Sequence, residues 1–339
     1  METKRLLMGE NKEKSIKTAA EILNNGGVVA MPTETVYGLA ASAYDSSAIE
    51  KVFLAKGRPQ DNPLIVHIAD YETLKEIACD IPPKALECAT VFWPGPFTMV
   101  LKRTQRIAPC VAGGLDTVAV RMPNNDIALS LIKESGLALA APSANSSGKP
   151  SPTTAHHVLA DLDGKIDAVI MGERSGVGVE STVVSFVCEK PRLLRPGAVT
   201  LEQLKEIIPE IEVDKAVLSS PKEGEKVSSP GMKYKHYAPK CELYLVEADI
   251  SDFAKFVNEK NDGVALCFSE EKEHICTQSI VYGSKENPES LAYTLFDILR
   301  ELDLKGIERG YVHAPEKSGV GLAVYNRLIR ACGYKVIKL

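Results

Sequence analysis

The 339-residue chain lacks the signals that place a protein in a membrane or outside the cell. No apolar run approaches the roughly 18 residues that a helix needs to cross a bilayer. The N-terminus, Met1–Arg5, is followed by a short apolar patch and then by charged residues, which is unlike a signal peptide. The sequence therefore predicts a cytoplasmic protein with no membrane partner.

The sequence also lacks several motifs that identify large enzyme classes. It has no G-x-x-x-x-G-K-[ST] phosphate loop, no H-E-x-x-H zinc motif and no G-x-S-x-G nucleophile elbow. None of the eight cysteines forms a C-x-x-C pair, and the six histidines do not combine with them at metal-ligand spacing. A Walker ATPase, a zinc protease and an α/β-hydrolase are therefore disfavoured, and no dedicated metal site is expected.

A basic excess is missing as well, because the formal net charge is -5. Domains that bind bulk nucleic acid normally carry a surplus of Lys and Arg. A local basic face remains the basis for an alternative hypothesis, an RNA-binding protein whose affinity would fall steeply with salt. The residues that could form this face are Lys51, Lys56, Arg58, Lys102, Arg103 and Arg106.

Residues 1–208 contain a mixture of helix and strand patterns. Apolar positions at helical spacing, ended by a pair of glycines, predict a helix over Ser15–Asn25. A short buried strand over Val28–Met31 follows, and a polar loop is expected from Pro32 onward. Later segments do not alternate strictly, and strands predominate after Phe97. We expect an α/β domain with a mixed, twisted sheet.

Composition changes after this domain, in a segment assigned to residues 209–240 as a linker. Serine, proline and lysine replace apolar periodicity there, and the segment ends in the aromatic and basic run Met232–Pro239. A connection of this length is usually functional or disordered. Residues 241–339 then alternate between strand and helix patterns. The strand patterns are Leu243–Val246, Val264–Phe268, Ser279–Tyr282 and Gly310–His313.

That alternation predicts a smaller, Rossmann-like α/β domain with a parallel sheet at residues 241–339. The segment has no complete G-x-G-x-x-G turn, so no organic cofactor is expected. The sequence leaves open whether this second domain is regulatory, binds a partner or acts as a structural clamp.

Four segments of the first domain place polar residues at the ends of predicted strands or helices, where α/β folds bind ligands. They are Pro32–Leu39, Lys56–Pro63, Thr117–Met122 and Ala140–Gly148. In the second, Lys56 and Arg58 follow a helix that Ser46 or Ser47 can cap, and they flank a glycine. Both cations can converge on one polyanion, because Arg offers a planar fork and Lys a point charge. A solvated helix end is the alternative.

Arg121 lies among the apolar residues of the third segment, and a charge in such a strand needs a partner. Spacing leaves two partners equally open, an internal acid and the carboxylate of a ligand. The fourth segment opens from a buried strand into a loop of small residues and short donors, which can cradle phosphate. Together the four segments favour a nucleotide-using enzyme.

Three of these stretches, Pro32–Leu39, Lys56–Pro59 and Ser143–Asn145, resemble the signature stretches of the YrdC-like L-threonylcarbamoyl-AMP synthases. The resemblance covers roughly residues 10 to 208. The run from Ser229 to Pro239 resembles the tyrosine-rich linker motif of the long form of that family, which adds a C-terminal domain. A carbamoyl-transfer domain of the hydrogenase-maturation type shares the module, but the zinc-finger and acylphosphatase regions of that enzyme are absent from this sequence.

The resemblance implies an activity and its partners. Members of the family combine L-threonine, bicarbonate and ATP into threonylcarbamoyl-AMP and release pyrophosphate. A separate tRNA-modifying transferase complex then passes the threonylcarbamoyl group to an adenosine beside the anticodon, and direct tRNA binding by the synthase stays open. Mg²⁺ would accompany the ATP, held mostly by phosphate oxygens and water.

The resemblance also assigns residues to the two sides of one pocket. Threonine would be bound by Thr35, His67, Arg121, Ala141 and Ser181. Of these, Arg121 would take the threonine carboxylate. The ATP side would be lined by Lys56, Arg58, Asn62, Thr117, Ser143, Asn145, Ser151 and Arg195. A lid that excludes water would be formed by the linker residues Tyr234, His236 and Tyr237.

Overall fold

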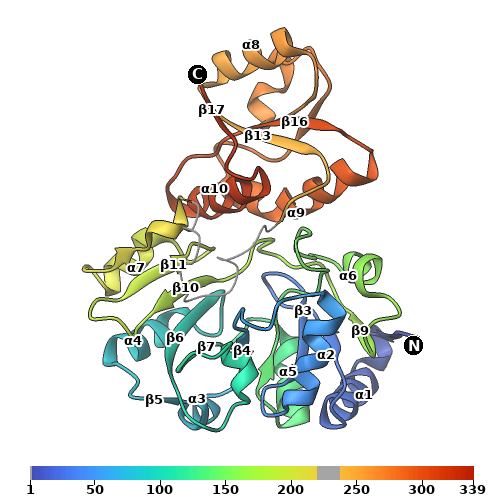
Figure 1. Ribbon diagram of the computed structural model, residues 1–339, viewed down its shortest axis with the longest axis vertical. Coiled ribbons are helices and arrows are strands. Elements are labelled where there is room, and N and C mark those ends of the chain that lie inside the picture. Colours follow the sequence, from blue (N-terminus) through green and yellow to red (C-terminus); the bar gives the residue numbers. More distant parts are fainter. Residues whose placement is uncertain (1, 220–236) are drawn as a thin grey trace.

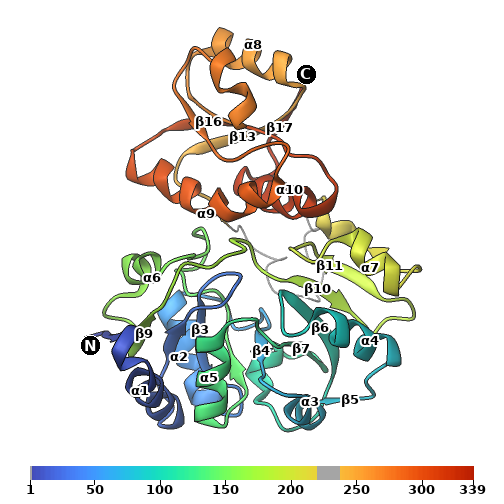
Figure 2. The ribbon, with the colours of Figure 1, turned by 180° about the vertical axis from the view of Figure 1, so that it is seen from behind.

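The computed structural model describes residues 2–219 and 237–339. They form a larger N-terminal domain around one wide sheet and a smaller C-terminal domain around a second sheet (Figure 1). Two helices of the smaller domain, α9 (Pro288–Leu304) and α10 (Gly319–Ala331), lie on its side facing the larger domain, as the opposite view in Figure 2 also shows. No helix in the described ranges is long and apolar enough to cross a membrane.

Within the described residues, the larger domain has a 12-stranded sheet with the order β1-β9-β2-β3-β8-β4-β7-β6-β10-β11-β12 and with β5 beside β6. The sheet contains both parallel pairs, such as β4–β7, and antiparallel pairs, such as β6–β7, which confirms the predicted mixed sheet. The strands are β1 (Lys4–Leu7), β2 (Val29–Met31), β3 (Gly38–Ser42), β4 (Ile65–His67), β5 (Ala78–Cys79), β6 (Phe97–Arg103), β7 (Thr117–Arg121), β8 (Leu139–Ala140), β9 (Ala168–Met171), β10 (Thr182–Ser185), β11 (Arg192–Arg195) and β12 (Glu212–Val213).

Helices cover this sheet, and their ends follow from local sequence. The helix that ends at Lys56 is capped by the carboxylate of Asp45, which accepts a hydrogen bond from the backbone N–H of Ser47, so the cap lies just before the two serines considered for it. It stops at Gly57, whose φ of 60° suits glycine. The helices are α1 (Lys12–Asn24), α2 (Ser46–Lys56), α3 (Tyr71–Ile77), α4 (Pro83–Phe92), α5 (Asp126–Ser135), α6 (Ala155–Leu162) and α7 (Leu201–Ile207), with 3₁₀ turns η1 (Gly9–Asn11), η2 (Pro109–Ala112) and η3 (Lys215–Val217).

The smaller domain confirms the predicted parallel, Rossmann-like sheet. Its strand order is β15-β14-β16-β13-β17, and all its strand pairs are parallel. Helix α10 is buried along almost its whole length because it lies between this sheet and the larger domain. The remaining elements are β13 (Glu242–Glu247), α8 (Ile250–Lys260), β14 (Val264–Cys267), η4 (Ser269–His274), β15 (Ser279–Val281), β16 (Arg309–His313) and β17 (Val336–Lys338).

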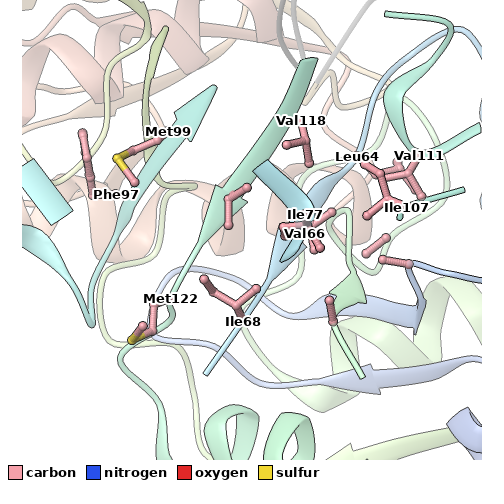
Figure 3. Close-up of a cluster of buried hydrophobic side chains, with 14 of the residues drawn as sticks. Leu64, Val66, Ile68, Ile77, Phe97, Met99, Ile107, Val111, Val118 and Met122 are labelled. Carbon is pink, nitrogen blue, oxygen red and sulfur yellow. The ribbon is translucent and has the colours of Figure 1, made fainter. Parts of the chain in front are cut away.

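The main core lies on one face of the central strands of the larger domain. Figure 3 shows Val66 of β4, Met99 of β6 and Val118 of β7 in this cluster. Successive residues of a strand point to opposite faces. The neighbours of these residues therefore lie on the other face, where Ile65 and Ala119 form part of a smaller apolar cluster. Alternation thus places polar residues of the same strands beside that second cluster.

Two features differ from the sequence-based expectations. Residues Gly38–Ser42, where a polar loop was expected, form the fully buried strand β3. This strand, with the sequence Gly-Leu-Ala-Ala-Ser, contains none of the β-branched or aromatic residues that are typical of strands. In addition, β12 pairs with β11, and Val217 is buried, although both lie inside the segment assigned to a linker. The described fold of the larger domain therefore continues past residue 208.

Candidate functional site

A cleft opens on the sheet face opposite the main core. Most of the residues assigned to the pocket from the sequence line this cleft. They are Thr35, Lys56, Arg58, His67, Arg121, Ala141, Ser143, Asn145, Ser151, Ser181, Arg195 and Tyr237.

Four other assigned residues are placed differently. Asn62 is buried and is not among the lining residues, although its backbone carbonyl accepts a hydrogen bond from Arg58. Thr117 begins β7 and is likewise not part of the cleft wall. Tyr234 and His236 lie outside the described residues. The binding roles assigned to these four residues, like those assigned to the residues of the cleft wall, stay predictions.

The charged group on one side of the cleft is Arg121, which is buried at the end of β7. Its Nη1 donates a hydrogen bond of 2.8 Å to Thr35 Oγ1, and its Nε donates to the carbonyl oxygen of Gly95. Its Nη2 lies 2.6 Å from Glu34 Oε2. An internal acid therefore pairs with Arg121, which was one of the two partners left open. Glu34 itself does not line the cleft, so it holds the guanidinium from behind the wall.

His67 lies beside Arg121, because β4 and β7 pair in parallel with these two residues in register. The imidazole is buried, and its Nδ1 has no hydrogen-bond partner among the described residues. Burial, followed by repulsion from Arg121, lowers the pKa of His67 to about 3. The ring is therefore neutral at physiological pH, and a polar group of a ligand can use its nitrogen without meeting a charge.

Ser181 and Arg195 form a linked pair on the next part of the wall. Arg195 Nη2 donates to Ser181 Oγ at 3.1 Å, and its Nε donates to the Ser181 carbonyl oxygen at 3.0 Å. The same serine hydroxyl lies 2.7 Å from Thr98 Oγ1 of β6. Burial lowers the pKa of Arg195 to about 10, so the group stays charged at neutral pH. Arg195 is therefore a second fixed cation in the cleft wall, in addition to Arg121.

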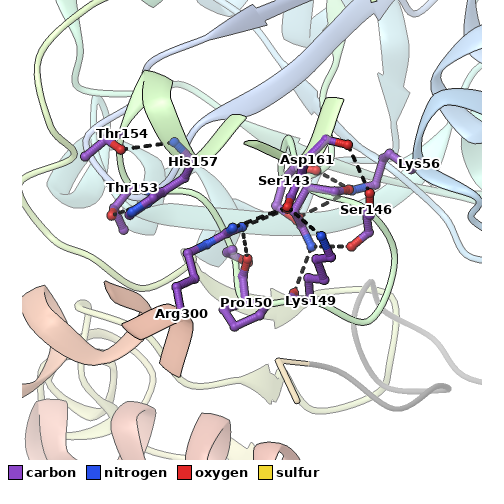
Figure 4. Close-up of polar contacts among 12 residues, drawn as sticks. Lys56, Ser143, Ser146, Lys149, Pro150, Thr153, Thr154, His157, Asp161 and Arg300 are labelled. Atoms are coloured by element: carbon purple, nitrogen blue, oxygen red, sulfur yellow. Dashed lines mark hydrogen bonds and ion pairs between the residues drawn. The ribbon is translucent and has the colours of Figure 1, made fainter. Parts of the chain in front are cut away.

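On the other side of the cleft, Lys56 holds the loop that follows β8. Its ammonium donates to the carbonyl oxygen of Ser143 (Figure 4). It also donates to the carbonyl oxygen of Asn145 at 2.7 Å. Burial, followed by repulsion from Arg58, lowers the pKa of Lys56 well below its usual value. Lys56 therefore acts mainly by shaping the loop, whereas the sequence suggested a point charge aimed at the ligand.

Arg58 also lines the cleft. It follows the glycine that ends α2 and is partly exposed at the cleft. Its Nη2 donates two long hydrogen bonds, of 3.4 Å to the Asn62 carbonyl and 3.3 Å to the Pro63 carbonyl. Bonds of this length are weak, so phosphate oxygens can compete for the same donor.

The alternative hypothesis, an RNA-binding protein, requires its Lys and Arg side chains to form one exposed face, and several of them do not. Lys56 is buried and bonded to loop carbonyls rather than exposed. Arg103 donates to the carbonyl oxygens of Leu115 and Thr104, and Arg106 lies over the ring of Tyr44. These cations serve local structure, so the described surface gives no support to a continuous basic groove.

Sequence reasoning assigned no role to Glu180 and Arg327, which meet at the cleft wall. Glu180 lines the cleft, and its Oε1 accepts a hydrogen bond of 2.5 Å from Ser151. Its Oε2 accepts a bond of 3.0 Å from Nε of Arg327, a residue of α10 in the other domain. The signal was present in the sequence, because Arg327 interrupts an apolar helix as Arg121 interrupts an apolar strand.

Comparisons with known proteins give two family matches. Residues 21–197 match a family model described as telomere recombination, and residues 199–333 match one described as threonylcarbamoyl-AMP synthase, C-terminal domain. The chain is 44% identical to the threonylcarbamoyl-AMP synthase of Pyrococcus abyssi over 97% of both chains. It is also 44% identical to that of Bacillus subtilis over the full length of both.

A solved structure agrees with these matches. The crystal structure of Pyrococcus abyssi Sua5 complexed with L-threonine superimposes with a TM-score of 0.90. The two sequences are 41% identical, and the alignment covers 100% of each chain. The similarity therefore extends over both domains.

Proposed function

The chain belongs to the threonylcarbamoyl-AMP synthase family in its two-domain form, and on this premise we propose that its cleft joins L-threonine, bicarbonate and ATP. The products are threonylcarbamoyl-AMP and pyrophosphate, which makes the protein a nucleotidyltransferase. The observation that carries the proposal is that Arg121 and Arg58, from different elements of the sheet domain, line the same cleft. One cation serves an amino-acid carboxylate and the other a polyphosphate.

The threonine side follows from the group around Arg121. The guanidinium, already oriented by Thr35 and Glu34, binds the threonine carboxylate. Neutral His67 and the hydroxyl of Ser181 offer partners for the uncharged polar groups of threonine. The small side chain of Ala141 leaves room for the substrate next to the sheet. Threonine bound to a solved relative supports this assignment.

The reaction needs no protein nucleophile. The threonine amine bonds to the carbon of carbon dioxide, derived from bicarbonate, and loses a proton to give a carbamate. A carbamate oxygen then attacks the α-phosphorus of ATP, and the bond to the bridging oxygen breaks to release pyrophosphate. Arg58 and Arg195 stabilise charge on the phosphates, while Ser143, Asn145 and Ser151 position them.

Mg²⁺ is expected to accompany ATP in this reaction. Among the residues that the structure describes, no group of three His, Cys, Asp or Glu side chains could hold an ion. The donor set therefore fits a metal bound by phosphate oxygens and water, with hydroxyls such as Ser143 nearby. When bound, the ion neutralises charge on the phosphates.

Exclusion of water is the remaining requirement, because the product is a hydrolysable mixed anhydride. Tyr237 lines the cleft, and its ring packs on Phe296 of α9 with centroids 5.2 Å apart. The backbone N–H of Ala238 donates to the carbonyl of Gly148 on the phosphate-side loop. These contacts support the hypothesis that the end of the linker closes the pocket. A downstream transferase complex is then expected to receive the product.

Pyrophosphate release tests the proposal. The purified protein is incubated with ATP and Mg²⁺ in carbonate-depleted buffer, and threonine or bicarbonate is withheld in turn. Full release should require both, and the product should carry the mass of threonylcarbamoyl-AMP. Release that ignores either substrate contradicts the proposed reaction.

A further inference from the structure

The wall of the cleft that faces the C-terminal domain contains a buried carboxylate, Glu180. Both its oxygens have a partner, since Oε1 accepts from Ser151 and Oε2 from Arg327. Ser151 is one of the residues assigned to ATP. A negative charge next to a polyphosphate site opposes binding unless a cation compensates it. The position of Glu180 therefore requires an explanation.

Arg327 supplies that compensation from the other domain. Its side chain is completely buried, and it belongs to α10 rather than to any element of the larger domain. Besides its bond to the Glu180 carboxylate, its Nη2 donates to the Glu180 backbone carbonyl at 3.1 Å. Its Nη1 donates to the carbonyl of Pro196. One guanidinium thus holds both wall segments, the one that ends at Ser181 and the one that carries Arg195.

The two domains approach closely at this point. Gly178 has a φ of 87°, and a Cβ atom there would lie 2.3 Å from the Ala292 carbonyl oxygen of α9. The next residue, Val179, is fully buried within the apolar cluster of the C-terminal domain. The Glu180 segment is therefore enclosed between the cleft and the smaller domain.

The net charge of this part of the cleft wall depends on the contact between Glu180 and Arg327. Burial by itself would raise the pKa of Glu180, but the guanidinium of Arg327 and, next, that of Arg195 hold it below its usual value. Glu180 is thus an anion whose charge is cancelled mainly by a group outside the larger domain. The remaining net charge of the three groups is positive, as a phosphate site needs.

We propose that Arg327 is a positioning residue for ATP, through which the C-terminal domain neutralises Glu180 and fixes the wall that carries Ser151 and Arg195. The inference rests on the proposed function, because ATP is the ligand that this wall serves. It gives the C-terminal domain a definite part in substrate affinity: the domain supplies a charge that the catalytic domain lacks.

One contact between the domains, made by Arg174, lies away from the cleft wall and provides a control. Figure 4 shows Arg300 of α9 reaching Asp161 and the carbonyl oxygen of Pro150. Further along α9, Asp297 pairs with Arg174, which also donates to the Tyr293 carbonyl. Arg174 neither lines the cleft nor contacts a residue assigned to substrate. Its removal weakens the domain contact without altering the charge of the ATP wall.

The experiment is a double-mutant cycle in the full chain, read out as the KM for ATP, the KM for threonine and kcat. Arg327→Met should raise the KM for ATP about tenfold or more, since Glu180 then repels phosphate in a poorly solvated wall. The KM for threonine should change less than twofold. Arg327→Met with Glu180→Gln should recover most of the ATP affinity, because the amide still accepts from Ser151 and carries no charge. Arg174→Met should leave the KM for ATP unchanged.

Two outcomes overturn the inference. One is a wild-type KM for ATP in folded Arg327→Met protein. The other is an equal loss of ATP affinity in Arg327→Met and in the double variant, which would make Arg327 a purely structural contact. Thermal unfolding of each variant separates these results from misfolding. ATP binding is also measured by calorimetry without threonine, so the inference is tested even if the wild type releases no pyrophosphate, the result that would overturn the proposed function instead.

Discussion

Arg121 and Glu34 form an ion pair with 2.6 Å between Nη2 and Oε2, and the Arg121 side chain is only 4% exposed. A charged residue in the apolar strand around Arg121 needs a partner, and Glu34 is that partner within the protein. The guanidinium is oriented before any ligand arrives, since Thr35 and the Gly95 carbonyl accept hydrogen bonds from two further donors. A ligand carboxylate therefore meets a fixed cation rather than a mobile one.

This arrangement predicts that loss of Arg121 affects stability and activity separately. Arg121→Ala should lower the free energy of unfolding by about 3–5 kcal/mol, because the mostly buried Glu34 carboxylate loses its cationic partner and keeps only the backbone N–H of Asn124. Adding Glu34→Gln should recover part of that stability in urea unfolding. It should not restore threonine-dependent pyrophosphate release. Recovery of activity in the double variant would show that Arg121 does not bind threonine.

Lys56 and Arg58 should behave differently although they are two residues apart. Arg58→Ala should lower kcat/KM for ATP at least about a hundredfold, as loss of a phosphate-binding donor does, with little change in melting temperature. Lys56→Met should lower both activity and melting temperature, since the Ser143 and Asn145 carbonyls lose their buried donor. A Lys56→Met protein as stable as wild type would contradict the loop-holding role.

Selection of threonine over serine depends on one methyl group. A methyl in an apolar pocket is worth about 1–3 kcal/mol, or roughly 10–200-fold in kcat/KM. Competing the two amino acids in the pyrophosphate assay should give a ratio within that range. A serine rate below about a thousandth of the threonine rate would require an additional discriminating contact.

His67 should make the protein less stable as the pH falls. The unfolded chain protonates this side chain below about pH 6.5, whereas the folded protein keeps it neutral until about pH 3. Stability is thus present above pH 6.5 and declines through this window. Between pH 7 and pH 4 the loss attributable to His67 is on the order of 3 kcal/mol. Urea unfolding of His67→Gln should show a correspondingly smaller decline than wild type, and equal declines would contradict a buried neutral imidazole.

The sequence predicted the parts of the fold that local patterns encode. The parallel sheet of the C-terminal domain follows from regular strand–helix alternation, and α1 follows from helical spacing of its apolar residues. Strand β3 was not predicted because alanine and glycine carry no strand signal, and it is enclosed by pairing with β2 on one side and with the distant β8 on the other. Local spacing cannot show such long-range pairing.

The same limit applies to the site. Short motifs located Arg58, Ser143 and Arg121 because each stands out against its own neighbours in the chain. Spacing could not show that Lys56 turns toward the loop after β8, since that depends on where residues almost ninety positions away lie. Nor could it pair Glu180 with Arg327, which are 147 positions apart. These partners are set by tertiary structure.

Helix α10 has a consequence for how the protein unfolds. Its apolar residues share one cluster with Val36 and Val179 of the larger domain, so the two domains do not have fully separate interiors. Separating them exposes apolar surface and leaves the charges of Arg327 and Glu180 without each other. Two sheets of different architecture should therefore melt together, and a calorimetric scan should record a single heat-absorption peak for the whole chain.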